Sequence, residues 1–184
     1  MCGVAGFLLQ SNDKSLLNFD EVLTNMSNSI LHRGPDDFGI WCDELDGIGL
    51  AHRRLSILDL SKAGHQPMQS KNERYVISFN GEIYNHMEIR IKIENLNPTI
   101  NWNGHSDTET VLAAFELFGI EESLSMFTGM FAISLWDRKN QTLSLIRDRV
   151  GEKPLYYGWQ STDLGEVFIY ASELKAIKCF PKFK

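Results

Sequence analysis

The chain has 184 residues, of which 43% are hydrophobic and 23% charged, and its formal net charge is −6. This length is typical of one full-sized domain, and the acidic balance argues against a basic nucleic-acid-binding surface. The three cysteines, Cys2, Cys42 and Cys179, lie far apart and form no CxxC pair. That spacing argues against a disulfide framework and a zinc site, and it favours a reducing cytoplasm. The apolar stretch after Cys2 is too short to cross a membrane and follows no basic segment, so we expect neither a signal peptide nor a membrane span.

The first half of the chain reads as strands around one helix. The elements expected in chain order are a strand over 3–9, a helix from Asn18 to about Leu31, strands over 38–42 and 48–58, and a strand from Tyr75 to Phe79. Asn18 and Glu21 form a capping box for the helix. The strand from Tyr75 is expected to end at Asn80-Gly81, because this dipeptide is typical of a tight turn.

The second half alternates helices with hairpins. The expected elements are a helix over 87–96, a helix that Ser106 caps and Gly119 ends, a hairpin over 131–148, strands over 155–159 and 166–172, and a short helix over 173–178. The links are of hairpin length and do not resemble βαβ crossovers. The order therefore predicts an α+β fold with antiparallel sheets.

Cys2 directly follows the initiator methionine. Removal of Met1 would leave a residue with both a thiol and a free α-amine, whose ordinary pKa of roughly 7.7–8.0 lies near neutral pH. Such an amine can take the thiol proton, so Cys2 can serve as a nucleophile that carries its own general base. The alternative is a small hydrophobic residue that begins a strand, and Cys2 taken alone favours that alternative.

Other positions supply groups that complement a thiol nucleophile. The Asn80 amide and the Gly81 backbone N–H can form an oxyanion hole, although a plain hairpin turn explains the dipeptide equally simply. Arg54 suits a carboxylate ligand, unless it is an exposed cation of an edge strand. Asp107, in the first turn of a helix, can bind an ammonium group or complement the helix dipole. Together with Cys2, these groups match a free α-amino acid that has a side-chain carbonyl, such as glutamine.

Eight motifs of the chain occur in a familiar order. They are MCGVAGF, HRGPDDFG, AHRRLSILDLS, GHQPM, FNGEIYNH, SDTETVLAAFE, GMFAISLWD and RDRVGEKPLYYG. In this order they resemble the glutaminase domain of glutamine-dependent asparagine synthetases, which are class II glutamine amidotransferases and N-terminal-nucleophile (Ntn) hydrolases. The resemblance runs from residue 2 to about residue 177. It implies a four-layer αββα sandwich of two antiparallel sheets.

The resemblance also implies roles for matching positions. Cys2 would be the nucleophile, and Asn80 and Gly81 would form the oxyanion hole. Arg54 would bind the glutamine carboxylate, and Asp107 and Glu82 would hold the amino group. The positions that would line the pocket beside Arg54 are Leu55, Ser56, Ile57 and Leu58. No metal is expected.

The resemblance further implies that residues 1–184 are a glutaminase domain without the synthetase domain that follows it in the family. That absent domain uses ATP and Mg²⁺, and we expect neither cofactor here because the chain has no phosphate-binding glycine loop. The expected partners are glutamine and a synthetase domain or separate synthetase chain, and a homodimer is left open. Three alternatives remain: a catalytically inactive glutamine-binding or regulatory domain, a truncated fragment, and an Ntn amidase for another amide. The acceptor that is finally amidated also remains open.

Overall fold

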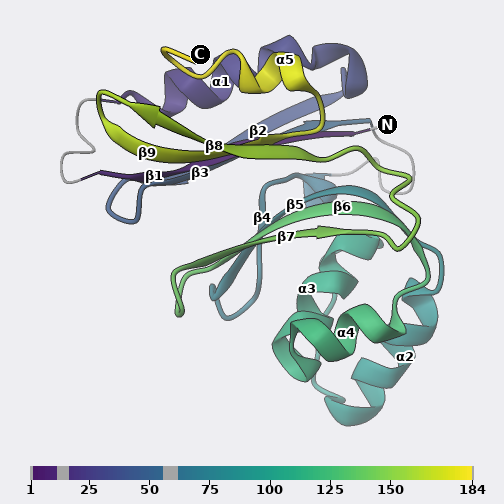
Figure 1. The fold of residues 1–184 in the computed structure, drawn as a ribbon. Helices are drawn as coiled ribbons and strands as arrows, with labels where there is room; N and C mark the ends of the chain where they lie inside the picture. The colour runs from purple at the N-terminus through teal and green to yellow at the C-terminus, as the bar shows by residue number, and fades with distance from the viewer. Residues whose placement is uncertain (1, 12–16, 56–61, 184) are drawn as a thin grey trace.

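The structure is a computed structural model that describes residues 2–11, 17–55 and 62–183. Two antiparallel sheets lie face to face, and helices cover the outer side of each (Figure 1). The helices α1 (Phe19–Ser29) and α5 (Leu174–Ile177) cover one sheet, and α2 (His86–Leu96), α3 (Asp107–Phe118) and α4 (Ile120–Met126) cover the other. This arrangement confirms the expected αββα sandwich.

The first sheet has the strand order β2-β3-β1-β9-β8, and the second has the order β4-β5-β6-β7. Strands of the first sheet are β1 (Gly3–Gln10), β2 (Asp37–Asp43), β3 (Ile48–Arg54), β8 (Tyr156–Thr162) and β9 (Gly165–Ala171). Strands of the second are β4 (Met68–Gln69), β5 (Tyr75–Ile83), β6 (Gly129–Asp137) and β7 (Thr142–Arg147). Two short 3₁₀ helices span Leu31–Arg33 and Lys62–Gly64. Because the chain returns to the first sheet with β8 and β9, strand β1 lies at its centre, between β3 and β9. Cys2 therefore precedes a central strand that is paired on both sides.

Each sheet forms an apolar core with its own helices. Phe7 and Leu9 of β1 pack with Leu23 and Met26 of α1 in one cluster. The other cluster joins the outer face of the second sheet to α2, α3 and α4. These outer cores fix the helices, so the inner layer between the sheets is free to carry polar groups at one end.

The predicted helix ends agree with the structure. The Asn18 side chain accepts a hydrogen bond of 3.1 Å from the Glu21 backbone N–H at the start of α1. At the start of α3, the Ser106 hydroxyl accepts one of 3.1 Å from the Thr108 N–H. Gly119 ends α3 with φ of 81°, a conformation that suits glycine. The helix α4, which follows directly, was not predicted.

The prediction that the strand from Tyr75 ends at Asn80-Gly81 is wrong. Strand β5 continues to Ile83, and Asn80 and Gly81 pair with Ala132 and Phe131 of β6. A Cβ atom on Gly81 would lie 2.2 Å from the Met130 carbonyl oxygen. Glycine is therefore required here by the close approach of β6 rather than by a turn.

Candidate functional site

One cavity of about 150 Å³ is lined by residues of both sheets, and Cys2, next to the N-terminus, is among them. The residues that line it are Cys2, Arg54, Leu55, Gly64, Gln66, Phe79, Asn80, Gly81, Glu82, Ser106, Asp107, Thr108, Met130 and Lys153. This set contains every predicted site residue that the structure describes. Ser56, Ile57 and Leu58 lie outside the described residues, so their place in the pocket stays a prediction.

Cys2 is held at both its side chain and its backbone. The Leu55 backbone N–H lies 3.4 Å from the Cys2 sulfur, which in turn lies 3.7 Å from the Leu55 carbonyl oxygen. The Arg33 Nε donates a 3.0 Å hydrogen bond to the Cys2 carbonyl oxygen. A second Arg33 nitrogen lies 3.1 Å from the Glu173 carboxylate, just before α5. Cys2 lies outside the hydrogen-bonded part of β1, and these contacts hold its thiol in the wall of the cavity.

Asn80 presents an unused donor to the cavity. Its side chain is 1% exposed, and its Nδ2 atom has no hydrogen-bond partner among the residues that the structure describes. A buried amide without a partner is unusual, because desolvation of an unpaired polar group is unfavourable. Gly81, next along β5, lines the same cavity. The pair can therefore direct polar groups at a ligand atom that lies next to the Cys2 thiol.

Arg54 contributes a buried cation at the end of β3. It is 8% exposed, and one guanidinium nitrogen lies 3.9 Å from the Asp37 carboxylate. A Cβ atom on Gly64 would lie 2.1 Å from another of these nitrogens. The Arg54 guanidinium thus packs directly against Gly64, where any side chain would displace it from the cavity wall.

Asp107 is a buried anion at the first residue of α3. It is 6% exposed, and its Oδ2 atom accepts a 2.9 Å hydrogen bond from the Ile83 backbone N–H. Burial raises the pKa of Asp107 to about 6, although the backbone N–H groups of Ile83 and Thr108 act in the opposite direction. The nearby Glu82 carboxylate adds to the increase. Asp107 is therefore ionised at neutral pH and can pair with a ligand ammonium group.

Several residues that contribute to the site were not predicted from the sequence. Gln66 is 6% exposed and links β5 to α3, because its Oε1 accepts from the Phe79 N–H at 2.7 Å and its Nε2 donates to the Thr108 hydroxyl at 3.2 Å. Lys153, from the loop between β7 and β8, is 6% exposed. Their motifs, GHQPM and GEKPLYYG, were visible, but no local signal in either motif singles out these side chains.

His52 connects the two sheets close to the cavity. Its Nε2 atom lies 3.0 Å from the Phe79 carbonyl oxygen, and its side chain is 1% exposed. Burial lowers the pKa of His52 to about 4. The imidazole is therefore neutral at pH 7, and its contact joins β3 to β5 behind the site.

The opposite end of the sandwich has a different hollow. This more open space of about 730 Å³ is lined by residues that include Leu8, Trp136 and Gly165, and no cysteine lines it. Among the described residues, no group of three or more His, Cys, Asp or Glu side chains could hold a metal ion. None of the helices in the described ranges is long and apolar enough to cross a membrane. The small cavity at Cys2 is therefore the candidate site.

Comparison with known proteins identifies relatives of this chain. The family model of the glutamine amidotransferase domain matches residues 1–184. Asparagine synthetase [glutamine-hydrolyzing] 1 of Bacillus subtilis is 39% identical over 96% of this chain and 26% of its own length. The putative asparagine synthetase [glutamine-hydrolyzing] 2 of Methanocaldococcus jannaschii is 36% identical over 96% of this chain and 35% of its own length. The chain thus spans only about a quarter to a third of these relatives.

A solved structure shares the fold. The glutamine phosphoribosylpyrophosphate amidotransferase from B. subtilis aligns with a TM-score of 0.73 and 20% identity, over 97% of this chain and 43% of that one. At this identity the likeness concerns the fold alone, which is that of an Ntn hydrolase. The family match covers every residue of the chain, so the chain belongs to the glutamine amidotransferase domain family.

Proposed function

We propose that this chain hydrolyses the side-chain amide of glutamine to glutamate and ammonia, with Cys2 as the nucleophile. One observation carries the proposal: a single small cavity is lined by the Cys2 thiol, the unpartnered Asn80 amide, the Arg54 cation and the Asp107 anion. A nucleophile, an oxyanion donor and a pair of opposite charges are what acyl transfer from a free amino acid requires.

The buried charges define how glutamine binds in this proposal. The Arg54 guanidinium holds the α-carboxylate, because its planar donors match two carboxylate oxygens. Asp107, which is ionised at neutral pH, pairs with the α-ammonium group, and Glu82 lies nearby to assist. The side chain of glutamine then extends toward Cys2 and Asn80. Leu55, which contacts the Cys2 sulfur through its backbone, borders this path.

The reaction proceeds in two acyl-transfer steps. Once Met1 is removed, the Cys2 α-amine takes the thiol proton, and the thiolate forms a bond to the amide carbon of the side chain. The Asn80 amide and the Gly81 N–H stabilise the oxyanion. The carbon–nitrogen bond then breaks, and ammonia leaves with the proton from the Cys2 α-ammonium group. Water hydrolyses the γ-glutamyl thioester, which releases glutamate and restores the thiol.

The released ammonia would serve a larger enzyme. Because the chain spans 26% of asparagine synthetase [glutamine-hydrolyzing] 1, we infer that residues 1–184 are the glutaminase unit of an asparagine synthetase-type amidotransferase. The part that amidates the acceptor, with ATP and Mg²⁺, would be a synthetase domain or a partner chain. Three free cysteines support a reducing compartment such as the cytoplasm.

The first test is the intact mass of the protein before and after treatment with a diazoketone analogue of glutamine, which alkylates active-site thiols. We expect a mass one methionine lower than the full translation and a single adduct on Cys2 that free glutamine prevents. The Cys2→Ala variant should form no adduct and lose all glutaminase activity while its far-UV circular dichroism is unchanged. Cys42→Ala and Cys179→Ala are matched controls that should behave as the wild type.

Other outcomes identify the alternatives. Retention of Met1, or labelling of Cys2 no faster than Cys42 and Cys179, would indicate a glutamine-binding domain without turnover. Faster hydrolysis of asparagine than of glutamine would indicate an Ntn amidase with another substrate. Undiminished glutaminase activity in Cys2→Ala would refute the mechanism.

A further inference from the structure

Lys153 is a buried cation in the candidate cavity for which the proposed chemistry has no role so far. It is 6% exposed and lines the cavity together with Cys2 and Asn80. Among the described residues, no carboxylate or other polar group forms an ion pair or hydrogen bond with its ammonium group. The Lys153 Nζ atom is not among the side-chain atoms that are fully buried without a partner, so it is open to the cavity, and a cation there can pair with an anionic group of a ligand.

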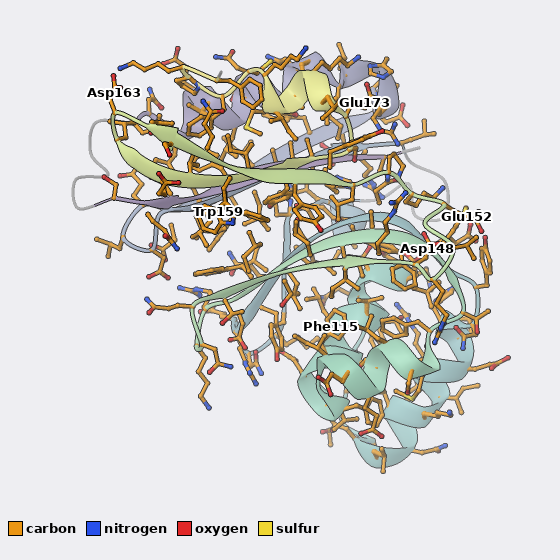
Figure 2. All side chains as sticks on the ribbon, in the orientation of Figure 1. Phe115, Asp148, Glu152, Trp159, Asp163 and Glu173 are labelled. Carbon is orange, nitrogen blue, oxygen red and sulfur yellow. The ribbon has the colours of Figure 1, made fainter. Side chains whose placement is uncertain are left out.

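The loop that carries Lys153 is fixed by two neighbouring side chains. Asp148 Oδ1 accepts hydrogen bonds from the Val150 N–H at 3.1 Å and the Glu152 N–H at 3.0 Å. Arg147 Nε donates a 2.6 Å hydrogen bond to the Lys153 carbonyl oxygen. Figure 2 shows Asp148 and Glu152 at the end of the sandwich where Figure 1 marks the N-terminus. The backbone of Lys153 is therefore preorganised at the cavity.

The same carboxylate ties the Lys153 backbone to β6, opposite Gly81 of β5. Asp148 Oδ2 accepts from the Lys153 N–H and from the Phe131 N–H, each at 3.2 Å. Phe131 is the register partner of Gly81 across β5 and β6. A single oxygen of Asp148 thus bridges the Lys153 backbone to β6, at the residue that pairs with Gly81. Arg54 reaches the cavity from β3 of the other sheet, so the two cations come from different walls.

The charged groups of the cavity outnumber those of free glutamine, and the extra cation matches the negative charge that forms during the reaction. Its wall carries two cations, Arg54 and Lys153, and two acidic groups, Asp107 and Glu82. Free glutamine has one carboxylate and one ammonium group, which Arg54 and Asp107 satisfy. The reaction creates a further negative charge at the side-chain end, first on the oxyanion and then on the γ-carboxylate of glutamate. Lys153 supplies a second cation to the wall of the same cavity, and its loop is tied to β6 opposite Gly81, so its ammonium group is available to meet that charge.

We propose that the Lys153 ammonium group stabilises the oxyanion formed from the side-chain carbonyl of glutamine and then binds the γ-carboxylate of the product glutamate. The inference rests on the proposed function. Lys153 forms no covalent bond and transfers no proton in this role. It acts in the transition state and on the product, whereas Arg54 and Asp107 act on groups that glutamine and glutamate share.

The test compares Lys153→Met and Lys153→Arg with Lys139→Met, which removes the same charge from the exposed turn between β6 and β7. For Lys153→Met we expect kcat to fall about 100- to 1000-fold, as for loss of one oxyanion donor, and KM for glutamine to change less than about threefold. The inhibition constant of glutamate should rise about tenfold. Lys153→Arg should recover part of both losses, and Lys139→Met should match the wild type.

Calorimetry in a Cys2→Ala background separates this inference from the proposed function. Lys153→Met should weaken glutamate binding about tenfold and leave glutamine binding nearly unchanged. Equal weakening for both ligands, or an unchanged kcat in the active background, would overturn the role of Lys153. If the wild type binds both amino acids without hydrolysing glutamine, the proposed function fails. A selective loss of glutamate binding in Lys153→Met would still support the binding of the glutamate γ-carboxylate by Lys153. If it binds neither, both proposals fail.

Discussion

The outer helix–sheet interfaces and the inner interface between the sheets are built from different side chains. Each outer interface is a large apolar cluster, whereas within the described part of the chain the inner cluster has four buried hydrophobic residues, Ile48, Leu50, Val76 and Trp136. Ser78 and Ser134 lie opposite each other in register on the inner face of the second sheet. We therefore expect most of the stability to come from the outer interfaces. The inner layer buries less apolar surface and carries polar groups that face the candidate site.

The largest effect expected from this comparison is the loss of an outer-core ring. Phe115 of α3 is 1% exposed, and its ring centroid lies 5.8 Å from that of Phe127 and 6.4 Å from that of Tyr75 (Figure 2). Phe115→Ala should lower the free energy of unfolding by about 3–5 kcal/mol, because it leaves a cavity in a close-packed core. Urea unfolding followed by circular dichroism measures this change.

Leu117→Ala is the matched control on the same helix. Leu117 is 44% exposed, so its truncation should change stability by no more than about 0.5–1 kcal/mol. A loss in Phe115→Ala no larger than that in Leu117→Ala would contradict the assignment of stability to the outer cores.

The outer layers could be predicted from the sequence because their signals are local. Asn18, Ser106 and Gly119 mark helix ends through hydrogen bonds and dihedral angles that depend on near neighbours in the chain. The short helix α4 was missed, because it follows Gly119 directly and so has no side-chain cap at its start.

The inner layer could be predicted less well because its geometry comes from distant segments. Instead of the turn expected at Asn80-Gly81, β5 pairs with β6 over nine residues, and this pairing cannot be predicted from a local dipeptide. The candidate nucleophile and charges came from residue chemistry and from a family resemblance. Lys153 was missed, because its place in the cavity depends on the contact of Asp148 with Phe131, 17 residues away in sequence.

The next effect concerns pH at the polar end of the inner layer. Burial raises the pKa of Asp107 to about 6 from an ordinary value of 3.8. Below about pH 6 the folded protein holds a neutral Asp107, which cannot pair with the glutamine ammonium group. The dissociation constant of glutamine, measured by calorimetry in Cys2→Ala, should therefore rise about tenfold between pH 7 and pH 5.

The sign of the same shift can be checked on the free protein. Because the folded pKa of Asp107 lies above the unfolded one, the contribution of Asp107 to stability falls as pH rises from about 4 to about 6 and is then constant. Buried His52, whose pKa is lowered to about 4, contributes in the opposite direction over nearly the same window, so the Asp107 contribution is measured as the difference between the wild type and Asp107→Asn. Asp107→Asn should abolish the pH dependence of glutamine binding, and the stability of the wild type relative to this variant should fall as pH rises from about 4 to about 6. Glu82→Gln should retain the pH dependence of glutamine binding. A glutamine affinity that is flat from pH 5 to pH 7 would refute the role of Asp107.

The smallest expected effect is the removal of a hydroxyl from the middle of the inner layer. Ser78 is fully buried, and its hydroxyl has no hydrogen-bond partner among the described residues. Ser78→Ala removes a polar atom whose desolvation is not offset, so unfolding free energy should change by less than about 0.5 kcal/mol or increase. Thermal and urea unfolding measure the difference.

Ser123→Ala supplies the contrast from an outer interface. Ser123 is also fully buried, but its hydroxyl donates a 2.6 Å hydrogen bond to the Gly119 carbonyl oxygen in α4. Its loss should lower stability by about 1 kcal/mol. If Ser78→Ala is destabilised as much as Ser123→Ala, the Ser78 hydroxyl must be satisfied in solution by a buried water molecule. The inner layer would then hold a water molecule at the level of Ser78, between Asn80 at the candidate site and Val76, which pairs with Trp136 at the opposite hollow.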